Sequence, residues 1–113
     1  MSVTSLRLEP VSLPPEQILE GEPSISHALI SSSADGRVER GVWEMTPGAV
    51  SDVEADELFV AVCGRATIEL ADGRIISVEP GDAVTLQEGE RTVWRVSETL
   101  RKVYQITHAE QAD

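Results

Sequence analysis

Residues 66–79, which read ATIELADGRIISVE, carry the pattern that decides the fold. Apolar side chains at positions 66, 68 and 70 alternate with Thr67 and Glu69, which is the two-residue period of a strand with one buried face. Asp72-Gly73 separates this run from Arg74–Glu79, and Asp-Gly between two strand-like runs is a strong hairpin signal. The stretch therefore predicts two antiparallel strands joined by a tight turn.

The same pattern continues on both sides of this hairpin: short strand-like runs are separated by turn residues. The polar stretch Ala49–Asp56 and the pair Gly64-Arg65 are predicted to be connections, whereas Glu57–Cys63 is apolar on both faces and is predicted to be a central strand. The predicted strands are His27–Ser33, Val38–Thr46, Glu57–Cys63, Ala66–Ala71, Arg74–Glu79, Ala83–Gln87, Arg91–Val96 and Arg101–Thr107. About eight strands at even spacing, with almost no helix, predict an all-β sandwich or small barrel.

The N-terminal region has a different composition. Four of the six prolines lie within residues 1–24, which predicts an extended arm with Pro15–Leu19 as a candidate short helix. The 113 residues fit one domain, which we place at 25–113. A small open barrel leaves edge strands that must be covered, so we expect a homodimer in which the arm or an edge strand contacts the partner.

Charge and apolar patterning exclude several classes of partner. Nine basic and twenty acidic residues give a net charge of −11, which disfavours nucleic acid and anionic lipid. The apolar runs fall far short of the roughly 20 residues that span a bilayer, and residues 1–17 lack the order of a signal peptide. The lone Cys63 fits a reducing compartment and is predicted to be a small buried side chain. We therefore expect a cytoplasmic protein.

Several short motifs resemble those of a known superfamily. They are Gly41-Val-Trp-Glu-Met-Thr-Pro-Gly48, Glu57 and Gly64, Glu79-Pro-Gly-Asp82, Glu88-Gly-Glu90, Thr92-Val-Trp94 and Arg101-Lys-Val-Tyr104. With them the sequence resembles the cupins over residues 25–107, and more narrowly the small single-domain cupins grouped with the ureidoglycine-aminohydrolase and ethanolamine-utilisation proteins. The resemblance implies a double-stranded β-helix, or jelly-roll barrel, whose interior holds the functional site.

The metal ligands that this resemblance implies are absent. Many cupins place two histidines a few residues before the glutamate that matches Glu57, and a third histidine in a second motif. The first pair falls on Ser51 and Val53 or on Val50 and Asp52, and the second motif falls on Gln87, Gly89, Thr92 and Val96. One carboxylate alone binds a transition metal weakly, so we expect no metal and no other cofactor. His27 and His108 lie near the ends of the β region and are predicted to be surface or strand-edge residues.

Glu57 is the leading site residue, because it matches an inward-facing position of the family. Burial without a metal would raise its pKa and make it a candidate acid/base or ligand anchor. The alternative is a structural carboxylate paired with an arginine. Trp94 and Tyr104 are predicted to face inward as well, either to contact a ligand or to fill the core. Trp43 and Glu44 lie on opposite faces of one strand, and we prefer Trp43 as the cavity residue.

Two functional classes are compatible with these residues. The first is a metal-free barrel that binds a small polar or carboxylated metabolite among Trp43, Glu57, Trp94 and Tyr104. The second is an enzyme acting on a small nitrogenous metabolite of amine or ureide catabolism, with Glu57 and Tyr104 moving protons. The sequence contains no phosphate-binding glycine loop, no Cys-x-x-Cys and no nucleophile elbow.

Overall fold

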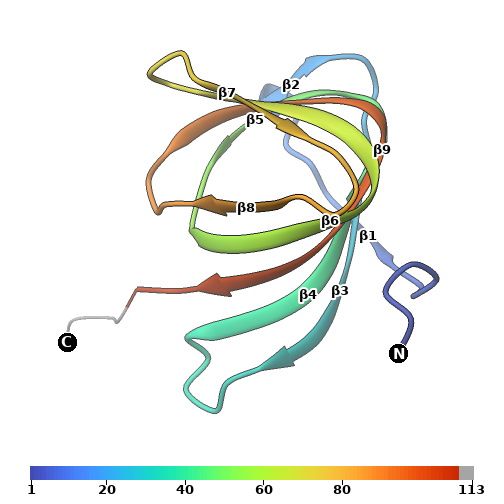
Figure 1. Ribbon diagram of the computed structural model, residues 1–113, viewed down its shortest axis with the longest axis vertical. Helices are drawn as coiled ribbons and strands as arrows, with labels where there is room; N and C mark the ends of the chain where they lie inside the picture. The colour runs from blue at the N-terminus through green and yellow to red at the C-terminus, as the bar shows by residue number, and fades with distance from the viewer. Residues whose placement is uncertain (110–113) are drawn as a thin grey trace.

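Two long antiparallel strands form the centre of the structure, β6 (Asp56–Leu70) and β9 (Arg91–Thr107). The computed structural model describes residues 1–109, and in it these two strands pair with each other along almost their whole length. Both curve strongly, so that the sheet closes toward itself (Figure 1). Their curvature creates the concave interior in which the site residues lie.

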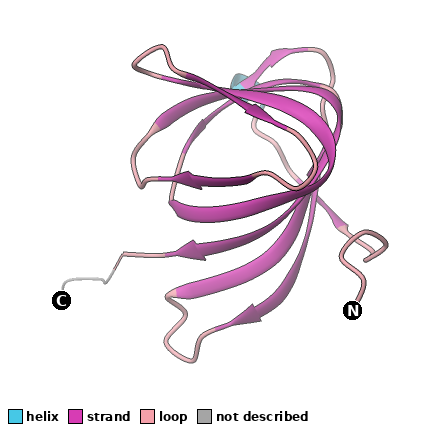
Figure 2. Ribbon diagram, in the orientation of Figure 1, coloured by secondary structure: helices cyan, strands magenta, loops and turns pink. Residues whose placement is uncertain are grey.

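Shorter strands extend the sheet from this central pair. β4 (Val38–Met45) pairs with the second half of β9, and β5 (Gly48–Val53) pairs with its first half. β3 (Ile25–Ser32) continues beyond β4, while β7 (Ile75–Val78) and β8 (Ala83–Leu86) pair with β6. Almost all of the ordered secondary structure is strand (Figure 2). This architecture confirms the predicted all-β jelly-roll barrel.

Gly64 lies inside β6, where the sequence predicted a turn between two strands. The pairing of β6 with β9 is irregular between Ala61 and Ala66, and Gly64 has a positive φ of 95°. A Cβ at this position would lie 2.1 Å from the carbonyl oxygen of Thr99 on β9, so only glycine fits. The prediction of a turn was wrong, because the bulge bends one strand instead of reversing the chain.

The bulge also changes which residues of β6 face inward. Before it, the buried residues are odd-numbered: Glu57, Phe59 and Ala61. After it, they are even-numbered: Ala66, Ile68 and Leu70. Cys63 lies in the irregular stretch and is exposed, so the prediction of a buried cysteine was wrong.

β9 and β5 also differ from the prediction. The runs Arg91–Val96 and Arg101–Thr107 belong to the single strand β9, whose even-numbered residues stay inward along most of its length. β5 occupies a stretch that was predicted to be a connection. Its Ala49 and Val50 are buried, but the polar residues after them interrupt the apolar pattern. Pairing with β9 therefore makes a strand of residues that lack a clear strand pattern.

Part of the N-terminal arm pairs with the sheet of its own chain. β1 (Glu9–Val11) pairs with β3, and β2 (Ile18–Glu20) pairs with β5. A one-turn 3₁₀ helix at Pro15–Gln17 lies between them, in the region of the candidate helix. No helix among residues 1–109 is long and apolar enough to cross a membrane. Residues 110–113 of the predicted domain lie outside the described residues.

Candidate functional site

The four residues singled out in the sequence, Trp43, Glu57, Trp94 and Tyr104, all line one cavity of about 440 Å³. The cavity lies inside the curl of the sheet, and β3, β4, β5, β6 and β9 contribute to its wall together with the segment around β1. Glu44 lies on the other face of β4, where its carboxylate accepts a hydrogen bond of 3.0 Å from Arg101 Nε. The cavity therefore combines aromatic and charged side chains.

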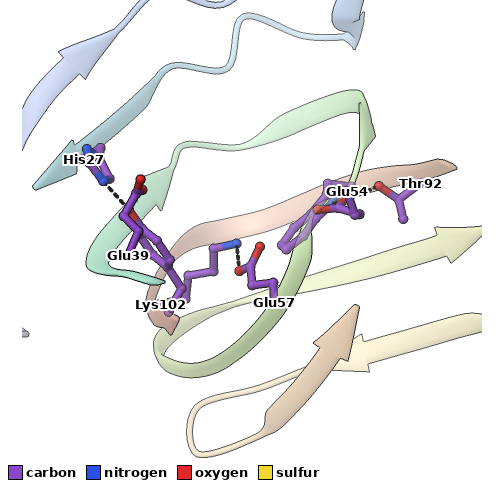
Figure 3. Close-up of polar contacts among 8 residues, drawn as sticks. His27, Glu39, Glu54, Glu57, Thr92 and Lys102 are labelled. Atoms are coloured by element: carbon purple, nitrogen blue, oxygen red, sulfur yellow. Dashed lines mark hydrogen bonds and ion pairs between the residues drawn. The ribbon is translucent and has the colours of Figure 1, made fainter. Parts of the chain in front are cut away.

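The most buried charged contact in the cavity is an ion pair between Lys102 and Glu57. Lys102 Nζ donates a hydrogen bond of 2.6 Å to Glu57 Oε2, and the two side chains are only 6% and 5% exposed. Figure 3 shows the two side chains meeting between neighbouring strands. Glu57 comes from β6 and Lys102 from β9, so the central strand pair of the fold places both groups.

Aromatic rings surround the ammonium group of Lys102. Its Nζ lies 4.5 Å from the ring centroid of Trp43, 4.6 Å from that of Trp94 and 4.7 Å from that of Phe59. Faces of aromatic rings attract cations, and more strongly when the cation is desolvated. Trp43 faces Lys102 directly across the β4–β9 pairing, so the register of the sheet sets this arrangement. Both tryptophans thus bound the cavity and help to hold its ammonium.

Burial raises the pKa of the Glu57 carboxyl, and the ammonium of Lys102 opposes that rise. The sequence left open whether Glu57 is a ligand anchor or half of a structural ion pair with an arginine. The structure gives it a cationic partner, which is a lysine. Because both members of the pair line the cavity, the contact can stabilise the fold and also face a ligand.

Glu54 is a second buried carboxylate, which the sequence analysis missed. Its Oε2 accepts hydrogen bonds from Thr92 Oγ1 at 2.7 Å and from Trp94 Nε1 at 2.9 Å. The segment after β5 is held by the turn before β9, because the Glu54 N–H donates to the Glu90 carbonyl and the Gly89 N–H to the Glu54 carbonyl. The indole of Trp94 therefore has a polar partner as well as a packing role.

The hydroxyl of Tyr104 is the centre of a third set of polar contacts in the cavity. Tyr104 Oη donates a hydrogen bond of 3.0 Å to Glu39 Oε2, and its other contact is with His27 Nε2. Burial and the Glu39 carboxylate raise the pKa of Tyr104, so the phenol stays protonated. Gly41 leaves room for this hydroxyl, because a Cβ there would lie 2.6 Å from it.

The two histidines both lie near the contact between Tyr104 and Glu39. His27 lines the cavity, so the prediction of a surface or strand-edge residue was wrong for it. The alternation of side chains along β3 places His27 on the concave side of the sheet, where its ring faces that of Tyr104. His108 is half-exposed, and its Nε2 lies 3.5 Å from Glu39 Oε1.

Asp52 lies at the wall of the cavity near Glu54. Burial raises the pKa of the Asp52 carboxyl to about 6, and the neighbouring Glu54 carboxylate adds to the rise. The residue as a whole is exposed, and its Oδ1 accepts a hydrogen bond of 2.8 Å from the Val53 N–H. Asp52 is thus partly in contact with solvent, and its surroundings favour the neutral, protonated form of its carboxyl.

The residues present do not fit the metal centre that the cupin resemblance implies. Among residues 1–109, no group of three or more His, Cys, Asp or Glu side chains is arranged to hold a metal ion. Thr92, which falls at a histidine position of the family, uses its hydroxyl to bind Glu54. The carboxylate that matches the family's ligand, Glu57, is paired with Lys102 instead.

Of the residues that the sequence analysis missed, Lys102 had a usable signal. It precedes Tyr104 by two positions, so strand alternation places both side chains on the same face. A lysine on an inward face has to find a carboxylate, and Glu57 was already expected there. Glu39 had the same kind of signal, since it precedes Trp43 by four positions on β4 and alternation places both on one face. Glu54 gave no such signal, because its position depends on a turn.

Comparison with known proteins places this arrangement in context. The chain is similar to a protein of unknown function of the DUF861 family from Pseudomonas syringae pv. tomato, with a TM-score of 0.83 and 26% identity over 95% of this chain. The match covers 46% of that protein, so this chain spans less than half of its length. No curated protein sequence matches the chain.

Two further solved structures extend the comparison. The EutQ protein of Clostridium difficile has a TM-score of 0.68 and 19% identity, over 89% of this chain and 83% of that one, which shows the shared fold. A DUF861 protein of Thermotoga maritima is 29% identical, with a TM-score of 0.55, over 57% of this chain and 75% of that one. The profile of the EutQ-like cupin domain matches residues 32–104, which is well over half of the sequence. The chain therefore belongs to the family of EutQ-like cupin domains.

Proposed function

We propose that the protein is a binding module whose cavity holds a small polar metabolite without the help of a metal ion. The observation that carries this proposal is the cavity itself, which encloses the buried Lys102–Glu57 pair between aromatic rings. Ligand sites are typically concave, about 300–1,000 Å³ in volume and largely apolar, with a few well-placed polar groups. The volume of about 440 Å³ suits a small metabolite.

Unused hydrogen-bonding capacity in the cavity supports a polar ligand. An ammonium group has three N–H donors, and among the described residues Lys102 uses one of them in a hydrogen bond, to Glu57. The nitrogen otherwise lies among aromatic rings, and Lys102 lines the cavity. A polar ligand group can accept from Lys102 while an apolar part lies against Trp43, which is only partly buried.

The proposal is tested with a panel of small nitrogenous and carboxylated metabolites. Thermal stabilisation identifies candidates, and titration calorimetry then gives their affinity for the parent protein and for Trp43→Leu. We expect at least one compound to bind, and the Trp43→Leu variant to bind it at least tenfold more weakly. An exposed substitution, Ile75→Ser, is the matched control because Ile75 lies on β7, outside the cavity wall. A panel without any binder, or equal affinity for both variants, overturns the proposal.

A second candidate function is an enzyme in which Glu57 transfers protons. The raised pKa of Glu57 favours it, because a buried carboxyl with a shifted pKa is suited to acid–base chemistry. Lys102 is then the group that exchanges a proton with Glu57. Tyr104 does not fill this role, since its hydroxyl is bound to Glu39. Incubation of each binder with the protein, followed by NMR, separates the two functions: turnover that is absent from a Glu57→Gln variant shown to be folded by circular dichroism favours the enzyme.

A further inference from the structure

Two buried carboxylates in the cavity each have one oxygen engaged and one free. Counted as whole residues, Glu54 and Glu57 are 6% and 8% exposed. Both hydrogen bonds to Glu54 end on Oε2, and the bond from Lys102 to Glu57 also ends on Oε2. Among residues 1–109, every fully buried side-chain polar atom has a hydrogen-bond partner, so the two Oε1 atoms, which accept no hydrogen bond, keep some accessible surface, and both residues line the cavity. Each therefore retains the capacity to accept a hydrogen bond from a ligand.

The charges around the cavity are unequal. Among the residues that the structure describes, four carboxylates line it, Glu39, Asp52, Glu54 and Glu57, whereas Lys102 is the one lysine or arginine in its wall. Lys102 is already paired with Glu57. Glu39 lies close to both histidines: His108 contacts it directly, and His27 contacts the Tyr104 hydroxyl that is bound to it. Glu54 and Asp52 accept hydrogen bonds only from neutral groups among the described residues. Negative charge at the Asp52–Glu54 end thus has no direct ion-pair partner among the described residues and is opposed only weakly, by the charge of Lys102.

The aromatic wall suits a cation as well. Three rings already lie within 4.7 Å of the Lys102 ammonium, measured to their centroids. Trp43 is partly exposed and lines the cavity, so it offers a ring to a second cation. A ligand carboxylate would instead meet these carboxylates, and the only ammonium available to it among the described residues is shared with Glu57.

We propose that the ligand carries a protonated nitrogen with N–H donors, a primary ammonium or a guanidinium, which binds at the Asp52–Glu54 end of the cavity and donates to a free carboxylate oxygen. This inference rests on the proposed binding function and names the ligand's chemical class. Hydrogen bonds between a charged donor and a carboxylate are the strong ones, so the N–H groups contribute in addition to the charge. A quaternary ammonium has no N–H donor and satisfies only the aromatic and electrostatic part of the site.

The test uses probes that share one four-carbon chain and differ in their head groups. They are n-butylammonium, n-butylguanidinium, n-butyltrimethylammonium, butyramide and butyrate. Chemical-shift titration of the labelled protein at pH 7.5 reports affinity and location together. We expect the first two to bind with shifts at Glu54 and Trp94, the trimethylated probe to bind at least tenfold more weakly, and butyrate not to bind.

A variant separates the carboxylate from the shape of the site. Glu54→Gln keeps an oxygen that can accept from Thr92 and Trp94 but removes the charge, so n-butylammonium should bind at least tenfold more weakly to it. Glu22→Gln is the matched control, because Glu22 is exposed and does not line the cavity. Circular dichroism and urea unfolding establish that both variants are folded. Equal affinity of folded Glu54→Gln and the parent protein for n-butylammonium overturns the inference.

The outcomes distinguish this inference from the function on which it rests. Binding of butyrate or butyramide at Trp43 and Trp94, with no binding of n-butylammonium, overturns the cationic ligand and leaves the binding module standing. If no probe and no panel metabolite binds in the cavity, both proposals fall. Binding of the ammonium probe that strengthens between pH 5 and 7 supports the inference further, because Asp52 ionises in that range.

Discussion

Lys102 and Tyr104 lie two residues apart on β9 and face the same cavity, yet their polar atoms belong to separate networks. Lys102 Nζ donates to Glu57 at 2.6 Å, whereas Tyr104 Oη donates to Glu39 at 3.0 Å. The Tyr104 ring lies 5.9 Å from the ammonium, measured to the centroid, and no hydrogen bond among the described residues joins the two networks. A substitution in one network should therefore leave the hydrogen bonds of the other intact.

The Lys102–Glu57 pair provides the first prediction. Glu57→Gln leaves a buried ammonium without its counter-charge, which typically costs about 3–5 kcal/mol of unfolding free energy. Urea unfolding at pH 7 measures the loss. The double variant Glu57→Gln/Lys102→Met should recover most of it, because both charges are then gone. A single variant as stable as the parent protein would contradict the structural role of the pair.

Two glycines with similar backbone angles provide the second prediction. Gly64 and Gly73 have φ values of 95° and 92°, but a Cβ at Gly73 would meet nothing within 4 Å. Gly73→Ala should therefore cost only about 1–2 kcal/mol, for the left-handed conformation. Gly64→Ala should cost a further ~1–3 kcal/mol, because its Cβ would collide with the backbone of β9. Equal losses in urea unfolding would show that the bulge tolerates a side chain.

The third prediction concerns pH. The pKa of Asp52 is about 6 in the folded protein and about 4 when unfolded, so the folded state binds the proton more tightly. Its contribution to stability is present below pH 4 and is lost as the pH rises through 6. Asp52→Asn should therefore be more stable than the parent protein at pH 7 and not at pH 4. We expect a gain of less than about 1 kcal/mol, because solvent screens this exposed residue. Thermal melts at both pH values measure it, and the same gain at both would contradict this assignment.

Metal content is the fourth prediction. The residues at the family's ligand positions supply no imidazole, and Glu57 is held by Lys102. We therefore expect well below one transition-metal ion per chain when the purified protein is dialysed and submitted to elemental analysis. Stoichiometric zinc, iron, manganese or nickel that survives washing with a chelator would contradict the prediction.

The fifth prediction is a homodimer. β1, β2, β7 and β8 each pair with a single neighbouring strand, so they leave edges that a second copy can cover. Multi-angle light scattering at micromolar concentration should give a mass near twice 12.2 kDa. A mass near 12.2 kDa under those conditions would count against it.

The sequence predicted the fold better than the site for a physical reason. Alternation within Ala66–Leu70 and the Asp72-Gly73 turn are local signals, and the hairpin of β6 and β7 confirms them. The bulge at Gly64 and the strand β5 depend on partners distant in the chain: a glycine between two strand-like runs fits a turn as well as a bulge, and β5 has no clear strand pattern. Trp43 and Trp94 line the cavity as strand alternation indicated, but Glu54 is placed by a turn whose geometry the sequence does not reveal.

β9 supplies Trp94, Lys102 and Tyr104 to the cavity wall from a single strand, together with Thr92, which binds Glu54 behind them. All four occupy even-numbered positions, and the alternation that turns them inward is kept across the bend. Inserting one residue between positions 96 and 100 would reverse the facing of everything on one side of it, so half of these groups would point to solvent. Length changes of a single residue in this strand should therefore be disallowed in functional relatives, while point substitutions at its even positions offer a direct way to redesign what the barrel accepts.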